Sequence, residues 1–414
     1  MLKTDPITVL HISPSYKPAF GYGGPTRSIA KLCESLTDAC HQIKTVVLTT
    51  TANGDKELKY ESGIGQRIEG VEVYFFQRWT KDHTHFAPGL LVALHRYLKK
   101  ANKEKRLLVI HIHSWWNLVA VLSAALSIYH RFPCIISPRG MLTAYTLSFR
   151  NTFSKYLIHG LIGRYLLQKA HVHATTRLEG KDLKQHLRTS KISIIPNLIT
   201  LDNRIEHDSF PFNSDLPSNK ECLKLLFLSR IDPKKGLELL FDALAVLPFC
   251  WTLTIAGTGK PAYIRLLKQL AGSLKISKHI RWIGQIEDAE KRKLLTTHDL
   301  LVLVSRNENF GNVVLESLLV GTAVLISDQV GLAAYVEEVN LGWICKTQRN
   351  DIASKLEDIY LNRAKRSQIR INGPQQISRD FNTRIILQEY INLYQMVLSN
   401  STLIGIPQPD QATS

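Results

Sequence analysis

The sequence predicts an α/β protein built from two Rossmann-like, doubly wound parallel-sheet domains. Short apolar segments of strand length recur along the chain, and each is followed by a stretch with the apolar spacing of an amphipathic helix. Continuous apolar strands are typical of a parallel sheet that helices cover on both faces. A polar, Pro-containing interruption separates two such series, which indicates two domains.

The first series occupies residues 1–200 and is predicted to form the N-terminal domain. Its first strand, 7–12, leads into a Gly-rich turn and a helix at 25–36, where Ile29, Leu32 and Leu36 recur at helical spacing. The later elements of this series are predicted as strands at 43–50, 71–76, 107–113, 134–137, 171–176 and 192–197, with helices near 118–128 and 151–169.

The second series occupies residues 222–381 and follows a polar, acidic linker predicted at 201–221. A crossing helix at 382–400 and a disordered tail at 401–414 are expected after it. In doubly wound sheets a ligand binds at the carboxyl ends of the strands. The elements of the second domain are predicted as strands at 223–229, 251–257, 280–285, 299–305, 323–327 and 341–345, with helices at 234–247, 261–274, 287–298, 312–320 and 331–339.

The composition indicates a globular protein, because 44% of the 414 residues are hydrophobic and 21% are charged. Its six cysteines show no CxxC pair, so we expect reduced thiols and no zinc site. The start of the chain does not resemble a signal sequence, since Asp5 and Pro6 interrupt it. The longest apolar stretch, 118–129, is shorter than the ~20 residues of a membrane span. We therefore expect a soluble or peripheral cytoplasmic protein.

Positive charge is concentrated in one part of the chain. The formal net charge is +17, and residues 95–200 hold 17 basic but only 3 acidic residues. Nucleic acid, an anionic membrane or a phosphorylated ligand could each explain this. Aromatic residues are not interleaved with the charges, which argues against nucleic acid. Segments 95–106 and 149–169 mix basic and apolar residues, as membrane-surface helices do. A core-packed helix with a basic outer face is the plain alternative.

Two turns carry residues suited to binding phosphate. The turn GYGGP places Gly21, Gly23 and Gly24 before a helix, whose N-terminus offers free amides to an anion. In the second domain, Arg230 and Lys235 lie five residues apart across a strand-to-helix turn. Both could face the carboxyl edge of the sheet, where they would neutralise a diphosphate leaving group. A Gly-rich turn and a solvated charged loop are the respective alternatives.

The most specific motif is SRNENFGNVVLESLL, residues 305–319, which holds Glu308 and Glu316. Phe310 and Gly311 precede a predicted helix, so Glu308 lies on the loop before it and Glu316 within its first two turns. Both carboxylates could then reach one ligand at the helix N-terminus. Carboxylates accept hydrogen bonds from hydroxyl groups such as those of a ribose.

The order of these motifs along nearly the whole chain resembles the retaining glycosyltransferases of family 4, which have the GT-B fold. The resemblance implies two domains facing a cleft, with the donor in the second and the acceptor in the first. It implies that Arg230 and Lys235 bind the donor diphosphate, that Glu308 holds the transferred sugar and that Glu316 holds the ribose. The further donor contacts that it implies are Gly24, Gln285, Ile286, Phe310, Gly311 and Asn312.

One position departs from the family pattern. In SPRGML, Arg139 stands where relatives commonly have a histidine that contacts the transferred sugar, which puts the identity of the sugar in doubt. His113 and Trp115 follow a predicted strand and could line the acceptor cleft with Arg139. No Asp-x-Asp stands at a strand end, so the basic pair is expected to replace a divalent metal. We expect no metal and no cofactor besides the nucleotide-sugar, such as a UDP- or GDP-sugar.

These observations predict a hexosyltransferase-type enzyme that acts on a glycan or lipid-linked glycan. The basic charge on the acceptor side suggests surface polysaccharide assembly (lipopolysaccharide, O-antigen or exopolysaccharide) on the cytoplasmic face of a bacterial inner membrane. A nucleotide-sugar epimerase on the same fold is one alternative. A non-catalytic protein that binds nucleotide-sugar or nucleic acid is the other.

Overall fold

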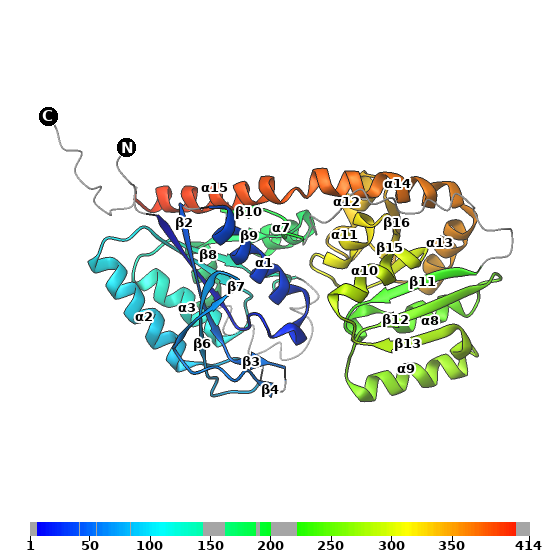
Figure 1. Cartoon of the computed structure of the whole chain (residues 1–414), viewed down its shortest axis with the longest axis horizontal. Coiled ribbons are helices and arrows are strands. Elements are labelled where there is room, and N and C mark those ends of the chain that lie inside the picture. The colour runs from blue at the N-terminus through cyan, green and yellow to red at the C-terminus, as the bar shows by residue number, and fades with distance from the viewer. Residues whose placement is uncertain are drawn as a thin grey trace. The chain divides into compact units, whose positions relative to one another are not determined.

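The computed structural model contains two compact units (Figure 1). One unit comprises residues up to Leu198 together with the segment from Thr383, and the other runs from Ile199 to Asn382. The predicted linker and most of the predicted tail lie outside the described residues. The structure describes residues 6–40, 42–54, 56–82, 84–143, 162–187, 191–199 and 222–402.

The first unit contains an eight-stranded sheet in the order β10-β9-β8-β7-β1-β2-β6-β5. All neighbouring pairs are parallel except β5 and β6, an antiparallel edge that the sequence did not lead us to predict. A small antiparallel pair lies outside this sheet. The strands are β1 (Ile7–Ser13), β2 (Ile43–Thr50), β3 (Ala52–Asn53), β4 (Lys56–Glu57), β5 (Gly65–Ile68), β6 (Val71–Phe76), β7 (Leu108–His113), β8 (Cys134–Ser137), β9 (His171–Ala174) and β10 (Ile192–Ile194).

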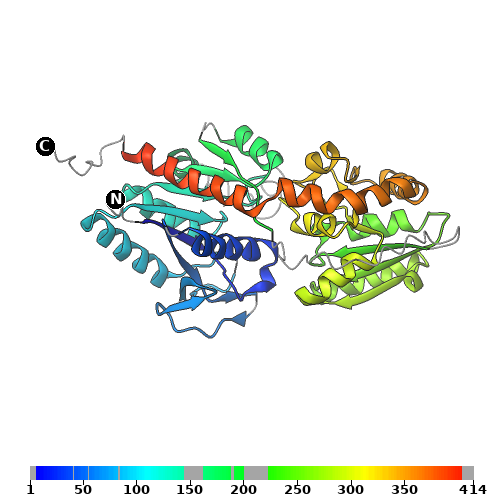
Figure 2. The ribbon, with the colours of Figure 1, turned by 45° about the horizontal axis from the view of Figure 1, so that its top comes forward.

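Helices cover both faces of this sheet (Figure 2). Leu10 and Ile12 of β1 belong to the apolar core shared with α2 and α3, whereas Ile29 and Cys33 of α1 pack in a second cluster on the other face. The C-terminal helix α15 (Thr383–Thr402) contacts α1 and β7 and so belongs to this second face. Its last turn includes Ser401, so the helix extends into the range 401–414 that the sequence predicts as a disordered tail. The other helices are α1 (Gly24–Ala39), α2 (Pro88–Lys103), α3 (Leu118–Tyr129), α6 (Arg164–Lys169) and α7 (Arg177–His186).

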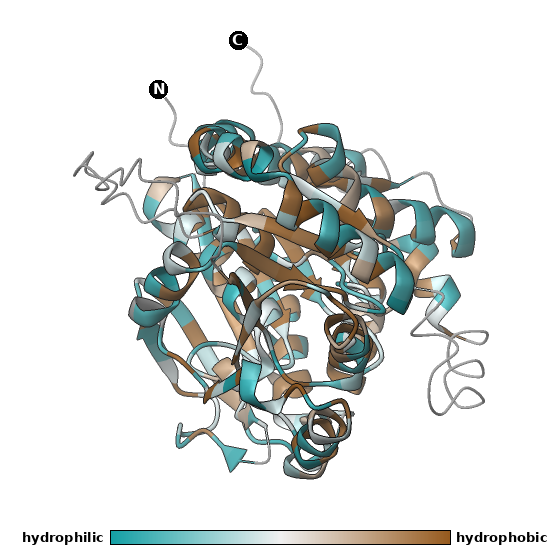
Figure 3. Ribbon diagram, turned by 90° about the vertical axis from the view of Figure 1, so that its right-hand side faces the viewer, coloured by the Kyte–Doolittle hydropathy of each residue, from teal (hydrophilic) through white to brown (hydrophobic). Residues whose placement is uncertain are grey.

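The second unit contains a six-stranded, fully parallel sheet in the order β13-β12-β11-β14-β15-β16. The chain moves outward from β11 in one direction and then returns to build β14 on its other side, which makes β11 and β14 the topological switch point. Apolar colour runs along its strands, while the helices alternate between apolar and polar faces (Figure 3). The strands are β11 (Leu223–Leu228), β12 (Trp251–Ala256), β13 (Ile280–Gly284), β14 (Leu300–Leu303), β15 (Ala323–Ser327) and β16 (Gly342–Cys345).

Seven helices accompany this sheet among the described residues, and the first five lie close to the predicted ranges. They are α8 (Leu237–Leu244), α9 (Pro261–Ser273), α10 (Asp288–Thr297), α11 (Asn312–Leu319), α12 (Ala333–Glu338), α13 (Arg349–Leu361) and α14 (Arg363–Asp380). None of the helices in the described ranges combines the length and apolarity that crossing a bilayer requires.

The expectation of reduced cysteines is wrong for one pair. Cys222 and Cys250 form a disulfide, with their Cα atoms 4.4 Å apart. Cys222 immediately precedes β11 and Cys250 immediately precedes β12, and the register of these strands places Leu223 opposite Trp251. Two residues that are 28 positions apart in the sequence are therefore neighbours across the sheet. The other four cysteines are free.

Candidate functional site

The turns after β11 and β14 lie side by side at the switch point of the second unit. The backbone N–H of Arg306 donates to the carbonyl of Lys234 across 2.8 Å, which joins the two turns. Asp232 starts a short 3-10 helix there, because its Oδ1 accepts from the N–H of Lys234 at 3.0 Å. Gly236 ends that helix with φ +71°, and a Cβ at this position would lie 2.4 Å from the carbonyl oxygen of Val304. The close contact between the turns therefore requires glycine.

Lys235 and Glu308 form an ion pair at this junction. Lys235 is 7% exposed, and Glu308 is held by backbone bonds to the 329–331 segment: its N–H donates to Gln329 O at 3.0 Å, and its carbonyl accepts from Gly331 N at 2.8 Å. Burial alone would raise the pKa of the Glu308 carboxyl. The charge and hydrogen bond of Lys235, with the charges of Lys234 and Arg230, nevertheless bring this pKa below its ordinary value.

This junction is strongly basic. Arg230 is exposed at the end of β11, and Lys234 is half-buried beside Lys235. Burial is the main cause that lowers the pKa of Lys234, while the charge of Glu308 opposes it. Three basic side chains thus surround one carboxylate, which leaves positive charge for an anion such as a diphosphate. The sequence led us to select Lys235 and to omit Lys234.

Helix α11 begins beside this pair. Gly311 is its N-cap in a left-handed conformation with φ +84°, so Asn312 is its first helical residue, and the Val314 amide donates to the Gly311 carbonyl at 2.8 Å. The Phe310 side chain is 4% exposed and packs edge-to-face on Phe381, with ring centroids 6.4 Å apart. Only the backbone of Phe310 could therefore contact a ligand.

Glu316 lies on the second turn of α11 and forms an ion pair with Lys291 of α10. Both side chains are partly exposed, at 27% for Glu316 and 23% for Lys291. Sequence analysis missed Lys291, since nothing in the EKRK segment indicates that α10 packs against α11. Gln285 is exposed and Ile286 is half-buried on the turn after β13, immediately before α10. All these residues belong to the carboxyl edge of one sheet.

Gly24, by contrast, belongs to the first unit, where it is exposed as the first residue of α1 after the N-cap Gly23.

The three residues expected to line an acceptor site are buried instead. His113 is 0% exposed and Trp115 is 1% exposed, so neither side chain reaches an open surface. Both lie where β7 ends, but they point into the packed interior. Arg139, at 9% exposed, is also largely covered.

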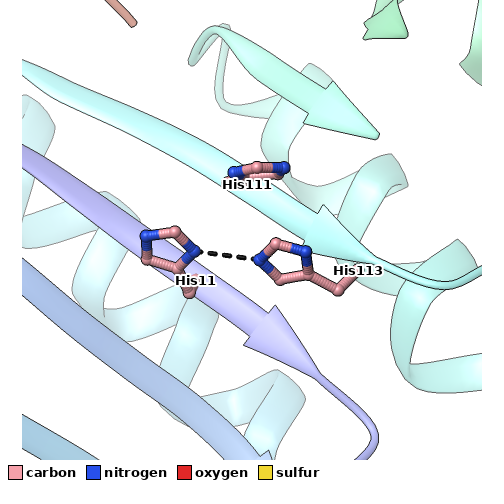
Figure 4. Close-up of side chains that lie close together, drawn as sticks. All are labelled: His11, His111 and His113. Carbon is pink, nitrogen blue, oxygen red and sulfur yellow. Dashed lines mark hydrogen bonds between the residues drawn. The ribbon is translucent and has the colours of Figure 1, made fainter. Parts of the chain in front are cut away.

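Arg139 contacts a buried cluster of three histidines, His11, His111 and His113. Figure 4 shows these three side chains. The guanidinium Nη1 donates to Asn197 Oδ1 at 2.9 Å, and Nη2 donates to His113 Nδ1 at 3.3 Å. His113 must then donate from Nε2 to His11 Nδ1, 2.9 Å away. The remaining proton of neutral His11 is on Nε2, which has no hydrogen-bond partner among the described residues.

A second hydrogen-bonded chain fixes the other histidines. His173 Nε2 donates to the carbonyl of Ile195 at 2.9 Å, so its Nδ1 accepts from Ser137 Oγ at 2.6 Å. Ser137 in turn accepts from His111 Nε2 at 2.7 Å, and His111 Nδ1 accepts from the hydroxyl of Tyr394 at 3.0 Å. Every member of this chain is neutral, and the chain ties α15 to the sheet.

Burial makes the imidazoles of this cluster poor bases, and the positive charge of Arg139 adds to the effect. The pKa of His11 and that of His173 are lowered to about 3, and those of His111 and His113 are well below their ordinary value. Three imidazoles within 4.8 Å of one another have the composition of a metal site. A cation there would lie beside the Arg139 guanidinium and would break the bond between His11 and His113, so the cluster fits a hydrogen-bond network better than a metal.

Comparison with known proteins identifies the class. The family model described as Glycosyltransferase Family 4 matches residues 22–203, and the one described as Glycosyl transferases group 1 matches residues 208–376. The fold agrees: sucrose-phosphate synthase from Thermosynechococcus elongatus is similar with a TM-score of 0.70 and 20% identity, over 95% of this chain and 100% of that one. These findings define a GT-B glycosyltransferase fold. The chain belongs to the group 1, family 4 glycosyltransferases.

Two further proteins illustrate the range of the relatives. Anabaena Alr3699/HepE, whose structure contains UDP and glucose, has a TM-score of 0.69 and 19% identity over 94% of this chain and all of that one. A phosphatidyl-myo-inositol mannosyltransferase of Mycobacterium leprae is 26% identical over 44% of this chain and 49% of its own. The match spans only about half the length of the first curated relatives.

Proposed function

We propose that this chain transfers a sugar from a nucleotide diphosphate donor, such as a UDP- or GDP-sugar, to a glycan or lipid-linked glycan acceptor. The observation that carries the proposal is the junction of Arg230, Lys235 and Glu308 at the switch point of the second sheet. An anion can bind the basic residues there, and hydroxyl groups can donate to the two carboxylates. Relatives whose structures contain UDP and glucose support this choice of donor.

The residues at this junction suit a reaction that retains the anomeric configuration. The bond between the anomeric carbon and the diphosphate oxygen breaks, and Arg230 and Lys235 stabilise the charge that develops on the leaving phosphate. The acceptor hydroxyl attacks from the same face, and its proton passes to the departing phosphate oxygen. This mechanism therefore requires no side chain to act as a base. Because two basic side chains can take the place of a divalent ion, we propose that activity does not require metal.

The donor site is tested by the melting temperature of the full chain with UDP, GDP, ADP and their sugars, with EDTA present. A ligand at 100 times its dissociation constant adds about 2.7 kcal/mol, which a melting shift reports readily. We expect a shift with one base, its loss in Glu316→Ala, and its retention in Glu337→Ala, where an exposed glutamate of α12 is removed as a matched control. If none of these nucleotides shifts the wild type, the proposed donor site is wrong.

We also propose that the first unit binds an anionic membrane surface peripherally on the cytoplasmic side, next to a lipid-linked acceptor of surface polysaccharide assembly. Its basic region exposes large apolar side chains: Tyr129 is 77% exposed and Tyr165 54%. Lys169 lies over the Tyr165 ring, 5.8 Å from its centroid. The mannosyltransferase relative, whose name specifies a phosphatidylinositol substrate, supports a lipid-linked acceptor.

Vesicle sedimentation tests the membrane proposal. Phosphatidylcholine vesicles with anionic phosphatidylglycerol should retain the protein at low salt and release it at high salt, because exposed charges are screened. Lys169→Glu should weaken retention, whereas Lys278→Glu, an exposed control in the second unit, should leave it unchanged. Equal recovery with and without the anionic lipid would contradict the proposal.

A further inference from the structure

Lys291 stands out because it forms an ion pair with Glu316, the second carboxylate of the proposed donor site. Glu308 has Lys235 as its partner at the junction of the two turns. Glu316 has a partner of its own, Lys291, on a different helix. A surface ion pair usually contributes little to stability. This pair differs from that case, because Glu316 Oε2 is buried and has no partner other than Lys291 among the described residues.

The position of Lys291 follows from the local fold. Helix α10 begins immediately after the 285–287 turn, and a capping box fixes that start: Glu287 N–H donates to Glu290 Oε2 at 3.3 Å. Lys291 is therefore the fourth residue of α10, close to the turn that carries Gln285. Glu316 is on the second turn of α11, where the ion pair with Lys291 joins the two helices.

We propose that Lys291 is a positioning residue for the nucleotide ribose, an inference that rests on the proposed donor site. Its ammonium group holds one oxygen of Glu316, so the carboxylate is fixed in place. The 27% of Glu316 that remains exposed then presents the other oxygen to the ribose hydroxyls. Lys291 also joins the base-side turn at Gln285 to the ribose-binding glutamate, which sets the distance between these two subsites.

A purely structural role makes a different prediction from ribose positioning. If Lys291 only stabilised the packing of α10 on α11, its loss would weaken every nucleotide to the same extent. If it positions Glu316, its loss would weaken only ligands that carry the ribose hydroxyls. Dissociation constants for UDP, GDP and ADP, each compared with its 2′,3′-dideoxy form, separate the two cases by calorimetry on the full chain.

We expect wild type to bind one ribonucleotide roughly tenfold or more tightly than its dideoxy form, the size of a charge-assisted hydrogen bond. In Lys291→Met this ratio should fall to about two or less, with the dideoxy affinity unchanged, as should also occur in Glu316→Gln. Lys291→Arg should restore the ratio, since arginine can also bind a carboxylate. Lys293→Met removes an exposed lysine from the same helix and should match wild type.

A double variant completes the test, because Lys291→Met should have no further effect once Glu316→Gln is present. Equal weakening of both nucleotide forms in Lys291→Met, or an unchanged ratio, overturns the positioning role and leaves the donor site standing. A wild type that binds the ribonucleotide without preferring it to the dideoxy form overturns the ribose role of Glu316 as well. A wild type that binds no nucleotide overturns the donor site itself.

Discussion

The two units place polar side chains at corresponding points of their sheets, yet the two clusters differ in charge and access. In the second unit, the turns after β11 and β14 present an ionised cluster, the ion pair of Lys235 and Glu308, in which Lys235 is buried and Glu308 is partly exposed. In the first unit, β1 and β7 are the neighbours at the switch point, and they carry His11 and His113, which are neutral and fully buried. A switch point thus provides a location for polar chemistry, but exposure decides whether that chemistry binds a ligand or supports packing.

The largest expected effect is the loss of activity when the ionised cluster is broken. Lys235→Ala should lower kcat/KM by about 100- to 1000-fold, because it removes a cation that would stabilise the leaving phosphate. The substitution also leaves the partly buried Glu308 carboxylate without its ion-pair partner. Initial rates with the donor identified by melting measure this effect, and Lys278→Ala, an exposed site on the same unit, is the control.

If Lys235→Ala retained wild-type kcat/KM while Lys278→Ala did the same, the ionised cluster would have no part in the reaction. Circular dichroism of each variant distinguishes a lost function from a lost fold. A result of that kind would remove the contrast between the two clusters, because both would then be structural.

The neutral cluster predicts acid sensitivity in the first unit. Unfolding restores an ordinary histidine pKa near 6.5, whereas the folded pKa values of His11 and His173 are about 3. The unfolded state therefore binds more protons between these values, and the stability present above pH 6.5 is lost as the pH falls towards 3. At pH 5 each of these two histidines should cost about 2 kcal/mol relative to pH 7.5.

Amide exchange of β7 and β9 peptides at pH 7.5 and pH 5 measures this loss of stability. His95→Gln alters an exposed histidine of α2 and should leave the pH dependence unchanged. Equal protection of these strands at both pH values would mean that the imidazoles are not buried as described, and the comparison between neutral and ionised clusters would fail.

The sequence predicts part of the structure around each cluster. Apolar periodicity predicted every strand of the second sheet, because a fully parallel sheet makes each strand a continuous apolar run. The edge strand β5 and the separate pair β3 and β4 were missed, since all three are short. The segment LVIHIH does alternate histidine with isoleucine, which could have indicated a polar face on β7.

The partners of the site residues were harder to predict. That Lys291 pairs with Glu316, and that Cys222 pairs with Cys250, depends on which elements are neighbours in space. Periodicity gives the type and order of elements but not their tertiary contacts. The burial of His113 and Trp115 was missed for the same reason, because a strand end can be covered by whatever packs on it.

The smallest expected effect comes from one hydrogen bond at the end of the neutral chain. Tyr394→Phe removes the hydroxyl that donates to His111 Nδ1 and leaves that buried nitrogen without a donor, which should cost about 1 to 3 kcal/mol. Because Tyr394 is on α15, amide exchange of this helix should rise while the second unit and nucleotide binding stay unchanged. Gln395→Ala, at the exposed neighbouring position, should have little effect on either. A stability loss confined to α15 and β7 would establish the neutral cluster as the polar anchor of this helix, whereas an unchanged exchange rate would mean that apolar packing alone holds it.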